Sequence, residues 1–459
     1  MKPCDRAFPA GRGTGRNRRP PAGAGPRAGR NRAADRIGRC QVTAKSARFG
    51  NSSSHISVLP LIAVLAHLCG AALADETLEA GTTDSEIRIG NIMPYTGPLA
   101  AFSTIGMTEA AYFDMINERG GINGRRIKFI SYDDSSDPAA ALEQTRKLVE
   151  TDKVLLMFGS FGTPGNLAVR PYLNARKTPQ LFLASGDEEW SNPKAFPWTM
   201  GWQPAFHAEG RIYANYIQAS YPERKIAVLW QNDQFGRDLF RGLQEGLGDW
   251  ARMIVSDISF DVSDKSIDSQ IDLLKDSGAE ILLFDGAPAI AALAIRRMAE
   301  LDWHPVFLLD NVSASIANAL RPAGLENSIG VISTSFLKNA GDPAWKDDAG
   351  MKDWSSFMEK YYPDGNKEDG NALFGYAAAE TLVQVLTQCG DDLSRENVMR
   401  QAASLKDFRG SILLPGIAVN TAPDDFRPIE QMRLVQFDGG TWQPIGDMIE
   451  SAFLGSGNK

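Results

Sequence analysis

Cysteine and histidine are scarce in this chain of 459 residues, and their positions argue against several kinds of chemistry. Three of the four cysteines precede residue 75, so Cys389 is the only cysteine between Asp75 and Lys459, and no disulfide can form within that part. The same part holds two isolated histidines, His207 and His304. The sequence therefore gives little support to a Ser-His-Asp triad or a histidine-rich metal site, and we expect neither a catalytic residue nor a metal ion.

The sequence motifs of nucleotide chemistry are also missing. The chain has neither the Gly-Lys-Ser/Thr sequence of a P-loop nor a G-x-G-x-x-G sequence, and it lacks the G-x-S-x-G turn that carries a serine nucleophile. We therefore expect no cofactor and no enzymatic activity. A secreted α/β hydrolase is the less favoured alternative, because it would need an activated nucleophile that the sequence does not show.

Charge is distributed very unevenly. Residues 1–50 carry a net charge of +11 and are rich in Gly, Pro, Ala and Arg, which is typical of a disordered segment; a nucleic-acid-binding arm is the alternative. Residues 75–459 carry a net charge of −19. Such a surface repels nucleic acid and anionic lipid, so we expect neither as a partner.

An uncharged apolar run, Ile56–Ala74, precedes the acidic part of the chain. It ends in Ala72-Leu73-Ala74, which fits the A-x-A pattern of a cleavage site, so residues 51–74 are predicted to be a signal peptide cleaved after Ala74, with the mature protein in the periplasm. A membrane anchor is the alternative, but the run is short and contains a proline and a histidine. Because signal peptides do not begin with long Arg/Pro tracts, we also expect that part of 1–50 is not translated.

After residue 86, apolar β-type runs alternate with segments whose apolar residues recur at helical spacing. This alternation predicts an α/β fold of parallel sheets covered by helices on both sides. The aperiodic, aromatic-rich stretch Pro197–Phe206 predicts a connection between two doubly wound lobes. The expected strands are 87–93, 127–134, 154–159, 180–184, 225–231, 254–260, 280–286, 305–310 and 330–336.

The segment Met157–Val169, "MFGSFGTPGNLAV", has the pattern of a strand that ends in a glycine-rich loop and opens a helix. In α/β proteins this position binds anions, because free backbone N–H groups of the first helical turn point at the ligand. Thr163 would add a hydroxyl, so the loop is predicted to hold a carboxylate. Alternatively, Thr163 only caps the backbone of its own helix.

Several segments of the chain resemble the leucine/isoleucine/valine-binding family of periplasmic receptors for ABC importers. The most specific are "TGPLA", "INERGGINGRRI" and "NDQFGRD", and the similarity covers Glu86 to Gly446. The resemblance implies a type I periplasmic binding fold with three interlobe crossovers. It also implies an N-terminal lobe of 86–205 with 336–412, a C-terminal lobe of 206–335 with 413–459, and a monomer that works with permease and ATPase subunits.

The resemblance further implies which residues bind the ligand. The carboxylate-binding hydroxyl of the family falls on Thr163, and the second carboxylate loop falls on Ser185, Gly186 and Asp187, where an acid replaces the usual small residue. An ionised Asp187 would repel a carboxylate unless it points away. The side-chain pocket of the family falls on Phe102, Phe161, Phe235 and Trp190.

The family's glutamate for the ligand ammonium group falls on Asn311, or on Asp310 if the alignment shifts by one residue. Because an amide cannot neutralise an ammonium ion, Asn311 favours an amine-free acid, whereas Asp310 would favour a branched-chain amino acid. The sequence thus predicts a solute receptor that closes its lobes on a carboxylate-bearing ligand. A sensor of the same fold is the alternative.

Overall fold

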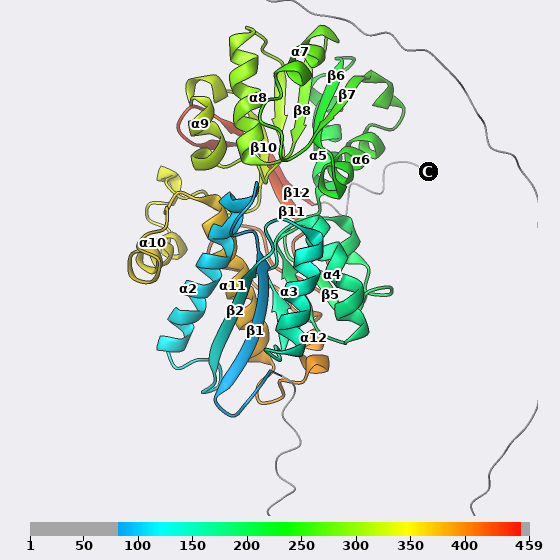
Figure 1. The fold of residues 1–459 in the computed structure, drawn as a ribbon. Coiled ribbons are helices and arrows are strands. Elements are labelled where there is room, and N and C mark those ends of the chain that lie inside the picture. The colour runs from blue at the N-terminus through cyan, green and yellow to red at the C-terminus, as the bar shows by residue number, and fades with distance from the viewer. Residues whose placement is uncertain (1–80, 451–459) are drawn as a thin grey trace, which may run out of the picture. The chain divides into compact units, whose positions relative to one another are not determined.

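The computed structural model describes residues 81–450, which form two β-sheets with helices packed on both faces (Figure 1). The predicted basic extension at 1–50 and signal peptide at 51–74 lie outside the described residues.

The first sheet is parallel throughout and has the strand order β2-β1-β3-β4-β5. Its apolar side chains are buried against α2 and α11 on one face and against α3 and α4 on the other. The strands are β1 (Glu86–Met93), β2 (Arg126–Asp133), β3 (Leu156–Phe158), β4 (Gln180–Leu183) and β5 (Thr199–Gly201).

The second sheet has the strand order β12-β11-β10-β9-β8-β6-β7. Strands β6 to β10 pair in parallel, whereas β11 pairs antiparallel with both β10 and β12. The strands are β6 (Ile226–Gln231), β7 (Ile254–Phe260), β8 (Ile281–Asp285), β9 (Val306–Leu309), β10 (Ile332–Ser335), β11 (Gln431–Phe437) and β12 (Trp442–Glu450).

Helices connect the parallel strands, as the period of the apolar residues predicts. The α-helices are α2 (Thr104–Glu118), α3 (Pro138–Glu150), α4 (Thr163–Ala175), α5 (Phe206–Ser220), α6 (Gln234–Leu247), α7 (Asp268–Asp276), α8 (Pro288–Glu300), α9 (Arg321–Ala323), α10 (Ala349–Tyr361), α11 (Gly370–Gln388) and α12 (Arg395–Ala402). The short helical turns are η1 (Ala100–Ser103), η2 (Glu188–Ser191), η3 (Gly248–Met253), η4 (Ile316–Leu320), η5 (Glu326–Ser328) and η6 (Pro343–Trp345).

The predicted α/β fold class is confirmed, and each predicted strand corresponds to one of β1–β4 or β6–β10. Strands β5, β11 and β12 were not predicted. The chain passes between the sheets three times: after β5, after β10 and before β11. The lobe boundaries stay predictions.

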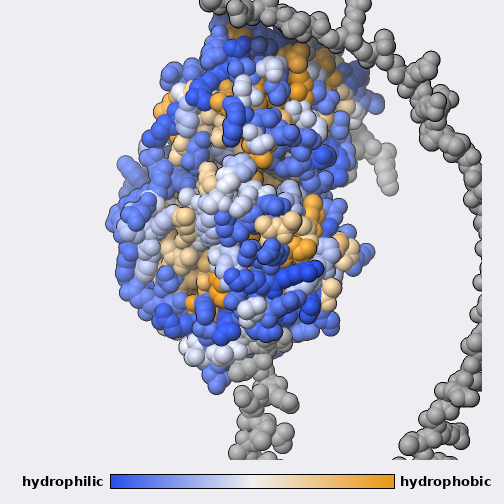
Figure 2. All heavy atoms as spheres, in the orientation of Figure 1, coloured by the Kyte–Doolittle hydropathy of each residue, from blue (hydrophilic) through white to orange (hydrophobic). Residues whose placement is uncertain are grey.

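In the view of Figure 2 the surface is mostly hydrophilic, and hydrophobic residues form small, separate groups. Among the described residues, the large hydrophobic side chains that are exposed are Met107, Val255, Leu273 and Ile329. None of the helices between residues 81 and 450 combines the length and the hydropathy needed to span a membrane.

Candidate ligand-binding site

A cavity of about 190 Å³ lies between the two sheets, near the carboxyl ends of their parallel strands. Both lobes line it, and so do the first two crossovers. Six of the ten predicted site residues are part of this lining: Phe102, Phe161, Thr163, Ser185, Phe235 and Asn311.

The loop between β3 and α4 brings Thr163 to the cavity. Gly162 precedes the helix with φ of 86°, a backbone conformation that favours glycine, and Pro164 follows in the first turn, where its missing N–H costs no hydrogen bond. Thr163 is buried, and its hydroxyl contacts the hydroxyl of Ser185 at 2.7 Å. The Thr163 side chain therefore pairs with a second loop instead of capping its own helix.

Ser185 follows β4 and receives a further hydrogen bond, at 3.0 Å, from the indole N–H of Trp190. In the Thr163–Ser185 pair only one hydroxyl hydrogen is used between the two oxygens, whichever residue donates. One hydroxyl hydrogen is therefore left to donate to a group in the cavity. Trp190 itself is buried behind Ser185 and is not among the lining residues.

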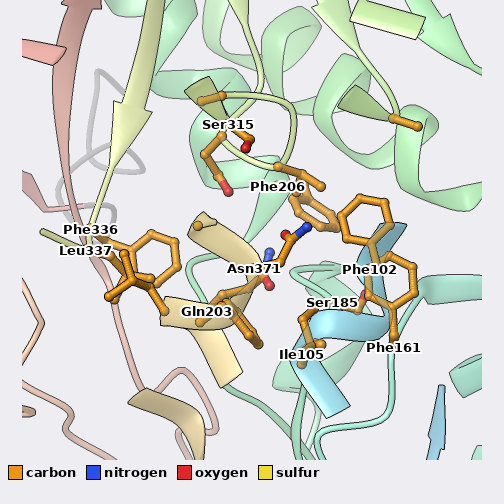
Figure 3. Close-up of a pocket in the computed structure, with 18 of the residues that line it drawn as sticks. Phe102, Ile105, Phe161, Ser185, Gln203, Phe206, Ser315, Phe336, Leu337 and Asn371 are labelled. Carbon is orange, nitrogen blue, oxygen red and sulfur yellow. The ribbon is translucent and has the colours of Figure 1, made fainter. Parts of the chain in front are cut away.

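Two pairs of phenylalanine rings make apolar walls. Phe102 and Phe161 stack with ring centroids 4.3 Å apart, and Phe206 and Phe235 meet at 4.6 Å with their planes tilted by 56°. Figure 3 shows Phe102 and Phe161 on the side of the cavity opposite Phe336. Such faces favour an apolar or aromatic ligand body.

Gly186 and Asp187 lie behind the lining. A Cβ atom at Gly186 would come within 2.5 Å of the Pro204 carbonyl oxygen, so only glycine fits against the first crossover. Asp187 is buried and accepts a hydrogen bond at 2.9 Å from the backbone N–H of Glu189, which caps η2. Burial raises the pKa of Asp187 to about 6. The acid that replaces the family's small residue therefore does not line the cavity.

Asn311 follows β9 and lines the cavity, while its neighbour Asp310 is fully buried. The Asp310 carboxylate accepts hydrogen bonds from the backbone N–H groups of Gly286 and Ser313, at 3.2 and 3.0 Å, and burial raises its pKa to about 7. Asn311, and not Asp310, therefore lines the cavity at this position.

The buried carboxyl group of Glu209, on α5, fixes the orientation of Asn311. It accepts hydrogen bonds from the Asn311 backbone N–H at 2.9 Å and from Asn311 Nδ2 at 2.7 Å. Tyr213 and Thr334 donate to the same carboxyl group, and burial raises the pKa of Glu209 to about 8. Asn311 therefore lines the cavity with an amide whose Nδ2 is already engaged by Glu209.

Three ionisable side chains line the cavity in the described part of the chain, namely Asp233, Lys338 and Glu368, and each already has polar partners. The partners, at 2.7–3.3 Å, are Gln231 and Gly236 for Asp233, Asp348 and Ser411 for Lys338, and Arg321 for Glu368. No group of acidic, histidine and cysteine side chains within 81–450 is arranged to hold a metal ion. Lys338 and Glu368 are thus ion-paired, whereas the partners of Asp233 are uncharged groups.

Sequence reasoning missed further lining residues: Gln203, Phe206, Thr334, Phe336, Asn339 and Asn371. Most of them lie on or beside the first two crossovers. The aromatic-rich stretch Pro197–Phe206 was interpreted as an interlobe connection, and that irregularity was the one local signal that could have indicated its contact with a ligand.

Residues 86–441 match the family model described as periplasmic binding protein. Among curated relatives, an "Amino acid binding protein" of Pseudomonas aeruginosa is 24% identical over 67% of this chain and 79% of its own length. "Leu/Ile/Val-binding protein homolog 2" of Brucella abortus is 23% identical over 75% of this chain and 90% of its own length.

Solved structures share the fold. A branched chain amino acid ABC transporter protein of Thermus thermophilus with bound valine has a TM-score of 0.74 at 16% identity, covering 81% of this chain and 98% of that one. A fatty acid ABC transporter substrate-binding protein of Thermomonospora curvata has a TM-score of 0.68 at 18% identity, covering 83% and 96%. The chain therefore belongs to the periplasmic binding protein family, has the type I fold of that family, and resembles its Leu/Ile/Val-binding members.

Proposed function

We propose that this protein is the extracytoplasmic receptor of an ABC importer and that it captures a small carboxylate-bearing solute with an apolar or aromatic body. The observation that carries the proposal is the cavity between the lobes, where the Thr163–Ser185 hydroxyl pair faces apolar walls. In the described lining no base lies beside these hydroxyls that could activate one as a nucleophile, which disfavours the hydrolase alternative.

The hydroxyl pair would bind the carboxylate end of the solute. The free hydroxyl hydrogen of Thr163 or Ser185 would donate to one oxygen, and backbone N–H groups at the start of α4 favour negative charge nearby. Hydrogen bonds to a charged acceptor are about twice as strong as neutral ones. Because Asp187 does not line the cavity, it leaves this end without a repelling charge.

The opposite end of the solute would meet Asn311. Its amide cannot neutralise an ammonium ion, and both carboxylates of the described lining already accept hydrogen bonds, Asp233 from Gln231 and Gly236 and Glu368 from Arg321. We therefore favour an amine-free acid over a branched-chain amino acid. One similar protein is named for binding amino acids and another for transporting a fatty acid, and both kinds of ligand carry a carboxylate.

Lobe closure would deliver the solute to the membrane partners. Contacts already join the lobes beside the cavity: Arg321 of α9 pairs with Glu368 at 2.8 Å, and Asn318 of η4 donates to Asp369 at 3.0 Å. Closure around a ligand is the common motion of such two-lobed receptors. We propose that the periplasmic protein, secreted after cleavage at Ala74, presents its closed form as a monomer to permease and ATPase subunits.

A matched pair of ligands tests whether the site binds a carboxylate and whether it prefers a ligand without an amine. Leucine and 4-methylpentanoate differ only in the α-ammonium group, so calorimetric titration of the purified protein compares the two cleanly. We expect 4-methylpentanoate to bind more tightly, and tight binding of leucine alone would contradict the amine-free proposal.

Loss of uptake of the labelled ligand after gene deletion tests the importer role against the sensor alternative.

A further inference from the structure

Two amide side chains of the cavity lining have a donor without a partner in the protein. Nδ2 of Asn339 and Nδ2 of Asn371 are buried without a hydrogen-bond acceptor. Gln203 adds a third amide to the same lining. Buried donors in folded proteins are nearly always paired, so this group of amides is unusual for a structural role.

These three amides come from separate segments that line one cavity only in the folded chain. Gln203 lies on the first crossover, after β5, and Asn339 lies on the second, after β10. Asn371 lies in the first turn of α11, where Asp369 caps the helix through the Asn371 backbone N–H at 3.0 Å. Figure 3 shows Gln203 and Asn371 between Phe336 on one side and Phe102 on the other. In this view the Gln203 and Asn371 side chains therefore lie between the two aromatic walls.

The charges around the amides restrict what they can bind. Lys338 precedes Asn339, but its Nζ is held by Asp348 and the Ser411 carbonyl, both at 2.8 Å. Glu368, the other ionisable residue beside them in the sequence, is paired with Arg321 at 2.8 Å, so neither Lys338 nor Glu368 is left as a free charge. The amides can therefore satisfy an uncharged oxygen, whereas a second ionised group would find no free counter-charge.

We infer that the ligand carries, besides its carboxylate, an uncharged oxygen acceptor such as a ketone, amide carbonyl or hydroxyl group, and that Asn371 and Asn339 donate to it. This inference rests on the proposed function, since it takes the same cavity as the ligand site. It assigns these amides a role in selectivity: a purely hydrocarbon body of the same shape would leave the buried N–H groups unpaired. Discrimination of this kind is strong where a site is built for a polar group.

Shape-matched ligand pairs test the inference. In 4-oxopentanoate and 4-methylpentanoate, and in 4-acetylbenzoate and 4-isopropylbenzoate, a carbonyl oxygen replaces a methyl group and the carboxylate is unchanged. Titration calorimetry should show at least about fivefold tighter binding of the oxygen-bearing member of the better-binding pair. Equal binding, or preference for the hydrocarbon member, would overturn the inference and leave the proposed function intact.

Substitutions of Asn371 and Asn339 test which residue causes the preference for the carbonyl-bearing ligand. Asn371→Leu is close in size to the native residue and should remove the preference for the carbonyl while the hydrocarbon member still binds. Gln388→Leu, an exposed amide at the other end of α11, is the matched control and should keep the preference. An unchanged preference in Asn371→Leu and Asn339→Leu would also overturn the inference.

A third pair, acetophenone and isopropylbenzene, separates this inference from the proposed function. Binding of acetophenone that depends on Asn371, without binding of any of the four acids, would reject the carboxylate ligand and support the amide subsite. Binding of none of the six compounds would reject both.

Discussion

The backbone N–H of Glu188 donates to the Asp238 carboxylate at 2.9 Å and so joins the first lobe to helix α6 of the second. Asp238 is fully buried and also pairs with Arg241 at 2.6 Å, while Glu188 pairs with Arg427. Burial, followed by repulsion from Asp187, raises the pKa of Asp238 to about 7. This contact therefore places a buried carboxyl group with a raised pKa where the two lobes touch.

The stability of the protein should fall between pH 6 and pH 8. Burial raises the pKa of Asp238 to about 7, so folding favours its protonated form, and this contribution to the free energy of unfolding is lost as the pH rises through 7. We expect the protein to be less stable at pH 8 than at pH 6 by about 1 kcal/mol or more, measured by urea denaturation. Asp238→Asn should flatten the dependence, and a steeper or unchanged slope in that variant would contradict the assignment.

Thr163→Val should weaken carboxylate binding by about 1.5–3 kcal/mol. The variant removes a hydroxyl that either donates to the carboxylate itself or holds the Ser185 hydroxyl in position to donate. Valine keeps the shape of threonine, so the melting temperature without ligand should change little. Thr387→Val, on the exposed part of α11, is the control. Unchanged affinity in Thr163→Val would show that the loop between β3 and α4 does not bind the carboxylate.

Much of the fold could be predicted because strands buried on both faces leave a clear sequence pattern. The runs at 226–231 and 281–285 are short, apolar and bounded by turns. In contrast, β5 is only three residues long, and the half-exposed β12 contains Pro444 and Gly446, so neither carries that pattern.

The part of the site that could be predicted lies where single strands end. Thr163 and Ser185 follow β3 and β4, a position where α/β folds bind ligands. The contact of Glu209 with Asn311 spans 102 residues, and Asn371 reaches the cavity from the start of α11. No local pattern marks such contacts, because they exist only after the lobes pack.

Asn311→Glu should destabilise the protein instead of simply creating an ammonium site. The new carboxylate would face the buried carboxyl group of Glu209, from which it would also remove the donor Nδ2. We expect a loss of about 2 kcal/mol or more in the free energy of unfolding, measured by urea denaturation. The double variant Asn311→Glu with Glu209→Gln should recover part of this loss, and strict additivity of the two changes would contradict the contact.

Gly159→Ala should destabilise more than Gly390→Ala. Both glycines have nearly the same positive φ, 62° and 61°, so the backbone cost of about 1 kcal/mol is matched. A Cβ at Gly159 would lie 2.0 Å from the buried Glu109 carboxylate, whereas a Cβ at Gly390 meets no atom within 4 Å. The difference in unfolding free energy should be about 1–3 kcal/mol, and equal losses would show that Glu109 can move aside.

Small-angle X-ray scattering of the secreted protein, with and without the ligand that raises its melting temperature most, tests the central claim of capture by lobe closure most directly. Because the cavity is lined from both lobes, a bound solute should draw them together, and we predict a smaller radius of gyration with ligand than without it. Thr163→Val at the same ligand concentration should compact less. An unchanged radius at saturation, with a ligand that clearly stabilises the protein, would contradict the account.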